Sequence, residues 1–191
     1  MTDEANKQAE EYSPSSRIDL LIKVINRYDT YITSTNAKAS LVIAWNGVLI
    51  GSIILKYQEI ISQFSCMCML SSTISILLVM CGLFALLSTG LIFGVVFPFL
   101  VPSNSEKGSL IFFGSVAKLK PHAYIDAMSS VSSKELVDDL ANQASVLAVG
   151  LNAKMRRLQQ SIWAIYAELL MIALMLILYA FNLEVTWRGV L

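Results

Sequence analysis

The most distinctive feature of the chain is a long stretch without a charged residue, from Ile60 to Ser105. Within it, residues 66–100 are almost wholly apolar or small. About 20 apolar residues suffice for a helix to cross the hydrocarbon core of a bilayer. A soluble domain would have nothing against which to bury such a surface, so the pattern predicts an integral membrane protein. Because residues 79–82 carry no convincing turn signal, we expect one long, tilted or projecting helix here rather than two short spans.

Two further apolar stretches, residues 40–57 and 161–181, predict a first and a third span. Glu168 lies about two turns inside the third span. An intramembrane carboxylate indicates a partner, a water-filled path or an oligomer interface, and shallow placement with access to water is the alternative. Two G-x-x-x-G pairs permit close helix packing, unless these glycines are incidental, and Asn46 can hydrogen-bond between helices. The residues predicted to act in membrane helix packing or a pore are Asn46, Gly47, Gly51, Gly90, Gly94 and Glu168.

Amphipathic segments precede the first and third spans. Apolar residues recur every three or four positions within residues 17–39, which predicts a helix with one apolar face: Ile18, Leu21, Ile25, Tyr28 and Ile32. Ser132 and Glu135 have the spacing of a capping box, which predicts the start of a long helix. Its apolar seam consists of Leu136, Leu140, Ala144, Leu147, Leu151, Met155 and Leu158. Between the spans, residues 108–116 predict either a short strand or an anchoring loop, and residues 121–128 a short helix.

The distribution of basic residues predicts the topology. Of the 14 Lys and Arg residues, 12 lie before position 39 or in segment 103–160. The positive-inside rule therefore places both regions in the cytosol, with the N-terminus cytoplasmic and the C-terminus periplasmic. The fold class is an all-α membrane protein with three spans and a small cytosolic head of amphipathic helices. The predicted division is a polar tail (1–16), a cytosolic helix (17–39), span 1 (40–57), span 2 (66–100), a head segment (103–160), span 3 (161–181) and a periplasmic tail (182–191).

Little of the chain suggests catalysis. The only histidine is His122, and the three cysteines lie in the apolar run without the second pair that a zinc site requires. Asp138 and Asp139 are most simply a solvated helix face. Zero formal net charge gives no general attraction to nucleic acid. We therefore expect no enzyme activity, metal or resident cofactor, which leaves a membrane sensor, a channel-like effector or a small transporter.

Three stretches resemble a known family. They are the sequence RYDTY at Arg27–Tyr31 followed by NAKA at Asn36–Ala39, the sequence LIFFG at Leu110–Gly114 with Tyr124 ten residues on, and QASVLAVGLNAK at Gln143–Lys154. Together, over about residues 17–180, they are similar to the transmembrane effectors of the Pycsar antiphage system, the PycTM family. The resemblance implies activation by cyclic CMP or cyclic UMP from a partner pyrimidine cyclase. It also implies a location in the bacterial inner membrane. Homo-oligomerisation in this lipid bilayer and impairment of the membrane would then cause abortive infection.

The chain lacks a recognisable cyclic-nucleotide-binding domain, so the site for the messenger has to be sought among individual residues. A cyclic mononucleotide needs a basic contact for its phosphate and an aromatic or apolar wall for its base. The candidates are Arg27, Tyr28, Lys38, Phe113, Lys118, Tyr124 and Lys154; Arg156 and Arg157 are better explained as membrane anchors. The alternative functions are a small oligomeric channel or transporter and an accessory membrane scaffold subunit.

Overall fold

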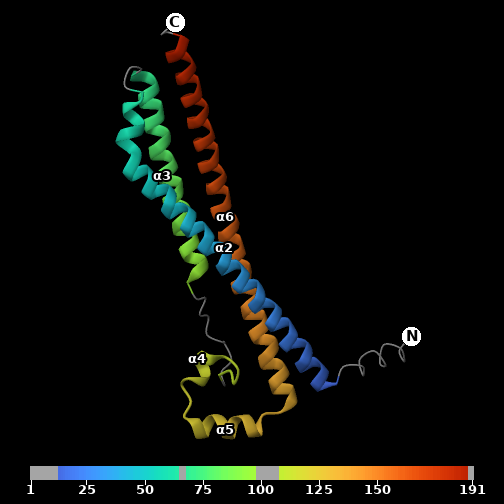
Figure 1. The fold of residues 1–191 in the computed structure, drawn as a ribbon. Helices are drawn as coiled ribbons and strands as arrows, with labels where there is room; N and C mark the ends of the chain where they lie inside the picture. The colour runs from blue at the N-terminus through green and yellow to red at the C-terminus, as the bar shows by residue number, and fades with distance from the viewer. Residues whose placement is uncertain (1–12, 65–67, 98–107, 189–191) are drawn as a thin grey trace, which may run out of the picture. The chain divides into compact units, whose positions relative to one another are not determined.

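The computed structural model describes residues 13–64, 68–97 and 108–188, and every element in these ranges is an α-helix. The helices are α2 (Pro14–Ser62), α3 (Cys68–Val96), α4 (Phe113–Val116), α5 (Pro121–Ser130) and α6 (Ser133–Arg188) (Figure 1). Helices α2, α3 and α6 are each long and apolar enough to cross a membrane. The structure confirms the prediction of an all-α membrane protein with three spans.

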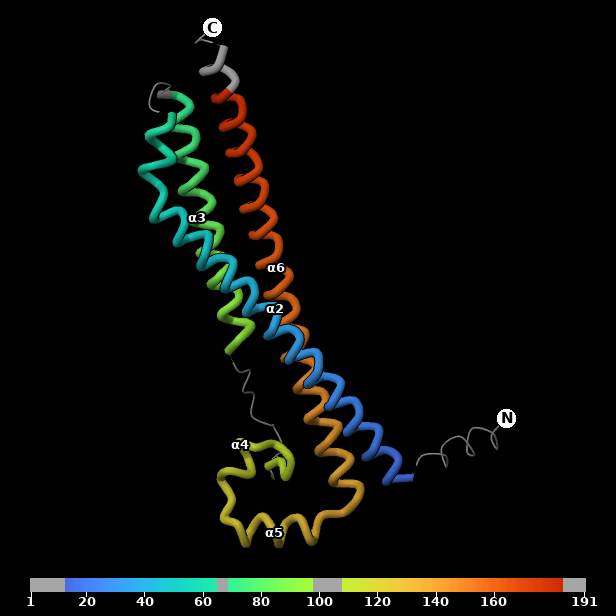
Figure 2. Tube along the Cα trace, in the orientation of Figure 1, coloured from blue at the N-terminus to red at the C-terminus, as the bar shows by residue number. Residues whose placement is uncertain are grey.

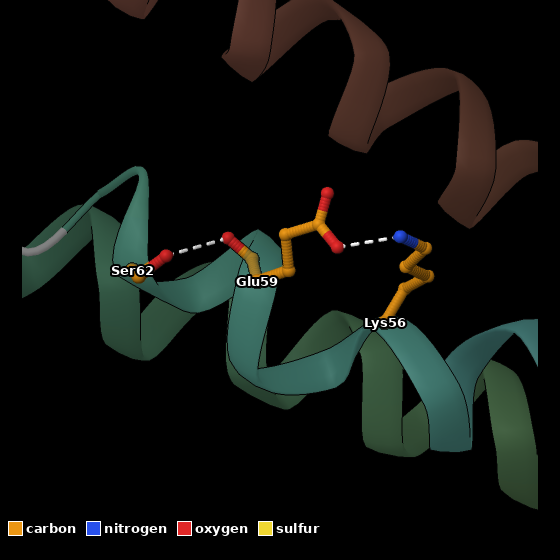
Figure 3. A network of polar contacts seen from close by, with 3 residues as sticks. All are labelled: Lys56, Glu59 and Ser62. Carbon is orange, nitrogen blue, oxygen red and sulfur yellow. Dashed lines mark hydrogen bonds and ion pairs between the residues drawn. The ribbon is translucent and has the colours of Figure 1, made fainter.

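Helix α2 is longer at both ends than the pattern predicted. It begins at Pro14 because Ser13 caps it: Ser13 Oγ accepts a hydrogen bond from the Ser16 amide at 3.3 Å, and proline suits the first helical position. Span 1 was predicted to end at residue 57, but the helix continues to Ser62. Lys56 Nζ pairs with Glu59 Oε2 at 2.6 Å, and the Ser62 hydroxyl donates to the Glu59 carbonyl at 2.8 Å (Figure 3). These polar residues therefore bond within the helix instead of ending it.

The long apolar run forms a single helix, α3, as expected. Its described part covers 29 residues without a break, so a division into two short spans is excluded for residues 68–96. The two ends of the predicted span, residues 66–67 and 98–100, lie outside the described residues.

The short segments before α6 agree with the prediction except in one respect. Helix α5 confirms the expected short helix, with Pro121 in its first turn. The capping box is confirmed: the Glu135 amide donates to Ser132 Oγ at 3.2 Å, and the Ser132 amide donates to Glu135 Oε2 at 3.0 Å. Of the two alternatives predicted for residues 108–116, the strand is wrong, because residues 108–112 form a loop that leads into α4.

The chain divides into two compact units. The head contains the described residues 13–34 and 108–153, and the bundle contains residues 35–97 and 154–188, apart from positions 65–67. Helices α2 and α6 contribute residues to both units. Most of the two predicted amphipathic segments, residues 17–34 and 133–153, accordingly belongs to the head, whereas their last residues, 35–39 and 154–158, belong to the bundle.

The three helices of the bundle pack through seams with the alternating three- and four-residue spacing of coiled coils. On α3 the buried residues are Ile74, Leu78, Cys81, Ala85, Ser88, Ile92 and Val95. Two apolar clusters close the bundle: the first cluster is Ala39, Ile92, Val95 and Leu158, and the second is Phe64, Ile74 and Leu78, with Met175 and Leu178 packed against it. In the first cluster, the late residues of α3 contact Ala39 and Leu158, which lie near the start of the bundle parts of α2 and α6. Helix α3 therefore runs antiparallel to both (Figure 2).

The seam predicted on α6 needs one correction. Met155 was placed in the seam, but it is 39% exposed, whereas Lys154 is only 8% exposed. Met155 lies at the edge of the contact, where its sulfur accepts a hydrogen bond from Thr35 Oγ1 at 3.7 Å. A strict count of apolar residues selected Met155 because lysine is not expected inside a helix contact.

Candidate functional site

Between the two apolar clusters, the interior of the bundle is polar. We call this region the polar layer: Asn46 on α2, Ser88 on α3, and Ser161 and Glu168 on α6, each 0% or 1% exposed. The other buried residues of this region are small, namely Cys81 and Ala85 on α3 and Ala164 on α6. The middle of the bundle therefore combines polar and small side chains, and its two ends are closed by large apolar ones.

Asn46 links α2 to α3. Its Nδ2 donates to the Ala85 carbonyl at 3.2 Å and to Thr89 Oγ1 at 3.0 Å. The hydrogen bonds between helices that were expected of Asn46 are therefore present. Its Oδ1 is buried and has no hydrogen-bond partner among the described residues.

Glu168 links α6 to α2. Trp45 Nε1 donates to Glu168 Oε2 at 3.3 Å, whereas Glu168 Oε1 has no partner in the described part of the chain. The buried hydroxyl of Ser88 is likewise unpartnered there. The side chain of Glu168 is 0% exposed, which contradicts the access to water that the alternative of shallow placement assumed. An unsatisfied buried polar group costs about 1–3 kcal/mol, so the unpartnered groups of the polar layer destabilise the closed bundle.

Two basic residues of α6 cap the C-terminus of α3. Lys154 Nζ donates to the Val95 carbonyl and to Asn36 Oδ1, the latter at 3.4 Å, and Arg157 Nη1 donates to the Gly94 carbonyl at 2.5 Å. The last carbonyls of a helix lack intrahelical partners and carry the negative end of its dipole, so cations are favourable there. Burial lowers the pKa of Lys154, and the neighbouring Arg157 lowers it further. Lys154 therefore has a structural role in this conformation.

The glycines of the predicted packing motifs differ in their surroundings. A Cβ added at Gly47, Gly51 or Gly90 would meet no atom within 4 Å, so these three do not mediate helix contacts within the described chain. Their role in contacts between chains stays a prediction. At Gly94 an added Cβ would lie 2.9 Å from Nη1 of Arg157, so glycine there allows the capping contact.

The residues predicted to bind a nucleotide are dispersed. Arg27 is exposed, its Nε donates to the Tyr31 hydroxyl at 2.9 Å, and this bond raises its pKa. Tyr124 donates to the Leu110 carbonyl at 3.2 Å, and the Phe113 ring contacts the Phe112 ring in a tilted arrangement, with centroids 4.9 Å apart. The remaining candidates Tyr28, Lys38 and Lys118 are half-buried, exposed and exposed, respectively. The structure thus brings no two of these candidates together through a hydrogen bond or ring contact described for them.

The head contains a cavity of about 470 Å³ that none of the predicted ligand residues lines. Its walls come from two segments and include Leu110, Ala127, Val131 and Leu136 as apolar surface and Glu135, Asp138, Asp139 and Asn142 as polar surface. Asp139 is not a solvated helix face as expected, because its Oδ2 accepts hydrogen bonds from Ser109 Oγ at 3.0 Å and the Leu110 amide at 2.9 Å. A cavity with three carboxylates and no basic lining residue repels an anionic phosphate.

The fold and the polar layer define a class: a membrane protein with three spans, a helical head and a buried polar interior. The chain matches the model of PycTM, the Pycsar effector protein domain, over residues 20–181, and it belongs to this family. It is accordingly a Pycsar effector of antiphage defence, in a system whose messenger is a cyclic nucleotide made by a cyclase. The family is not a known enzyme family. Neither the curated proteins nor the solved structures include a significant match.

Proposed function

We propose that the protein is a membrane effector that a cyclic pyrimidine mononucleotide activates. A partner cyclase makes cyclic CMP or cyclic UMP, and the effector then oligomerises and impairs the bacterial inner membrane, so that infection is aborted. The observation that carries this proposal is the family match over residues 20–181, which includes all three spans and the helices of the head.

The bundle has the properties of a resting effector. Its outer surface presents exposed apolar side chains, among them Leu41, Val48, Leu86, Leu170 and Leu176, which suit contact with lipid. Its polar groups are sealed inside. Such a bundle does not by itself perforate a bilayer, so activation has to change helix packing. A messenger can drive that change only by binding the active state more tightly than the resting state.

The messenger's phosphate needs an accessible cation, and the structure narrows the choice. Lys154 already donates a hydrogen bond to the Val95 carbonyl at the end of α3, and the head cavity is lined by acidic side chains. Arg27 and Lys38 are exposed. The bond to Tyr31 uses only Nε of Arg27, which leaves the other N–H donors of the guanidinium for a phosphate.

The test combines binding with membrane permeability. Full-length protein in liposomes is titrated with cyclic CMP and, separately, cyclic UMP, while release of an entrapped dye is recorded. We expect one nucleotide to trigger release, and Arg27→Ala or Lys38→Ala to weaken its binding by roughly tenfold, about 1.4 kcal/mol for a lost charged contact. Lys23→Ala, an exposed basic position of the same helix, is the control and should bind normally.

Three other outcomes would be decisive. Unchanged affinity in both variants would exclude Arg27 and Lys38 as phosphate ligands. Release without any nucleotide would favour a channel or transporter. An absence of binding and of release with either nucleotide would contradict the proposed function.

A further inference from the structure

We propose that the polar layer lines a cation pathway that opens in the active effector, with Glu168 as the residue that selects for cations. This inference rests on the proposed function, because it requires an active state in which the membrane becomes permeable. It adds that the permeating species are cations and that the side chain of Glu168 determines this selectivity.

The polar layer stabilises the closed bundle poorly. Asn46 Oδ1, Ser88 Oγ and Glu168 Oε1 are fully buried, come from all three helices and have no partner in the described ranges. Apolar side chains of similar size would pack the same space without this cost. Polar and ionisable residues inside a membrane characteristically mark the paths of ions and protons. The unpaired oxygens are therefore explained better by a hydrated, open state than by the closed one.

The size of the buried side chains varies along the bundle axis. On α6 the first cluster contributes Leu158, and then Ser161, Ala164 and Glu168 follow before Met175 packs on the second cluster. Small polar side chains thus lie between two constrictions of large apolar ones. Apolar constrictions stop conduction by excluding water, so separating the helices at both clusters would wet the layer between them.

The polar layer contains an acidic side chain and no basic one. Among the buried residues between the two clusters, Glu168 is the one acidic side chain, Cys81 is the one thiol, and none is lysine or arginine. Lys56 and Glu59 of α2 are exposed and pair with each other. Lys154 and Arg157 cap α3 beside the first cluster, and their nitrogens bind the carbonyls of Val95 and Gly94. When water enters, the Glu168 carboxylate is the charge that faces the path. A pathway lined by a carboxylate and neutral oxygens admits cations and repels anions.

The experiment measures ion selectivity of the full-length protein in planar bilayers under a KCl gradient, with cyclic CMP or cyclic UMP added. We expect a potassium-to-chloride permeability ratio of roughly fivefold or more, as for a pore with an acidic ring. Glu168→Gln should bring the ratio close to one, and Glu168→Asp should retain most of the selectivity. Glu59→Gln, which removes an exposed carboxylate at the end of α2 (Figure 3), is the matched control and should leave the ratio unchanged.

The outcomes separate this inference from the proposed function. Nucleotide-triggered current with the same selectivity in Glu168→Gln would overturn the inference and leave the proposed function intact. An absence of current with both nucleotides would overturn the proposed function. In that case Leu158→Asn, which places an amide in the first cluster, tests the pathway without a messenger. A constitutive, cation-selective leak that Glu168→Gln makes unselective would support the inference, and no leak would overturn it.

Discussion

Replacing Lys154 by glutamate is expected to destabilise the folded protein by about 3–5 kcal/mol, the usual cost of breaking a buried charged contact. The lysine amine lies among the Val95 carbonyl and Asn36 Oδ1 at the negative end of α3. A carboxylate there would face these oxygens without a donor. Lys154→Met, which keeps the volume and removes the bonds, should cost about 1–3 kcal/mol. The measurement is thermal unfolding of the detergent-solubilised protein.

Lys38 supplies the matched control, because it ends the same Asn-Ala-Lys sequence but is exposed. Lys38→Glu should therefore unfold close to the native temperature. Equal effects at the two lysines would contradict the capping role of Lys154. A Lys154→Met protein of native stability that fails to bind the cyclic nucleotide would instead support the original prediction of a ligand residue.

The second large effect is expected at Ser109 in the head. Its hydroxyl donates to Asp139 Oδ2 at 3.0 Å and accepts from the amides of Ile111 at 3.1 Å and Phe112 at 2.8 Å and from Gln143 Nε2 at 3.2 Å. Ser109→Ala removes the centre of this network and leaves several buried groups unpaired, so we expect a loss of about 2–4 kcal/mol in the local stability of the head. Hydrogen exchange of residues 109–119 measures it.

Ser129→Ala is the control for this substitution. Ser129 is exposed, and its hydroxyl donates to the Ile125 carbonyl within the same helix, a bond of little net value. Native exchange rates at residues 109–119 in the Ser109→Ala protein would show that the network does not hold the segment together.

The same network explains why residues 108–112 form a loop rather than the strand that was the other alternative for this segment. The β-branched and aromatic residues of this segment favour a strand by propensity, but propensity is decided by context. Here the Ser109 side chain bonds the amides of Ile111 and Phe112 that a ladder would need. Its partners Asp139 and Gln143 lie some 30 residues further along the chain, so no local pattern could reveal them.

The polar layer could have been found in part from the sequence. Intramembrane polar residues are conspicuous, and Asn46 and Glu168 stood out for this reason. Ser88 and Ser161 did not, because serine is tolerated on any face of a membrane helix. Extending the three- and four-residue spacing of the seam from Leu158 reaches Ser161, Ala164 or Ile165, and Glu168, which places Ser161 and Glu168 on one line. The contact of Trp45 with Glu168 depends on the relative rotation of two helices and has no signal in the sequence.

The capping of α3 was missed for a different reason. Lys154 and Arg157 stand among basic residues that the positive-inside rule already explains, and exposure to headgroups is the usual place of such side chains. Only the antiparallel packing of α3 and α6 brings the carbonyls of Gly94 and Val95 to them. Sequence patterns located the helices well, whereas the chemistry between helices required the packed structure.

The account depends above all on the head facing the cytosol, where a messenger made inside the cell can reach it. The direct measurement is labelling of a cysteine introduced at His122, an exposed position of α5, in a chain whose three native cysteines are replaced by serine. A membrane-impermeant maleimide should label this cysteine in inside-out vesicles and not in intact cells with a permeabilised outer membrane. Labelling from the periplasmic side would contradict the account, because no intracellular nucleotide could then bind the head.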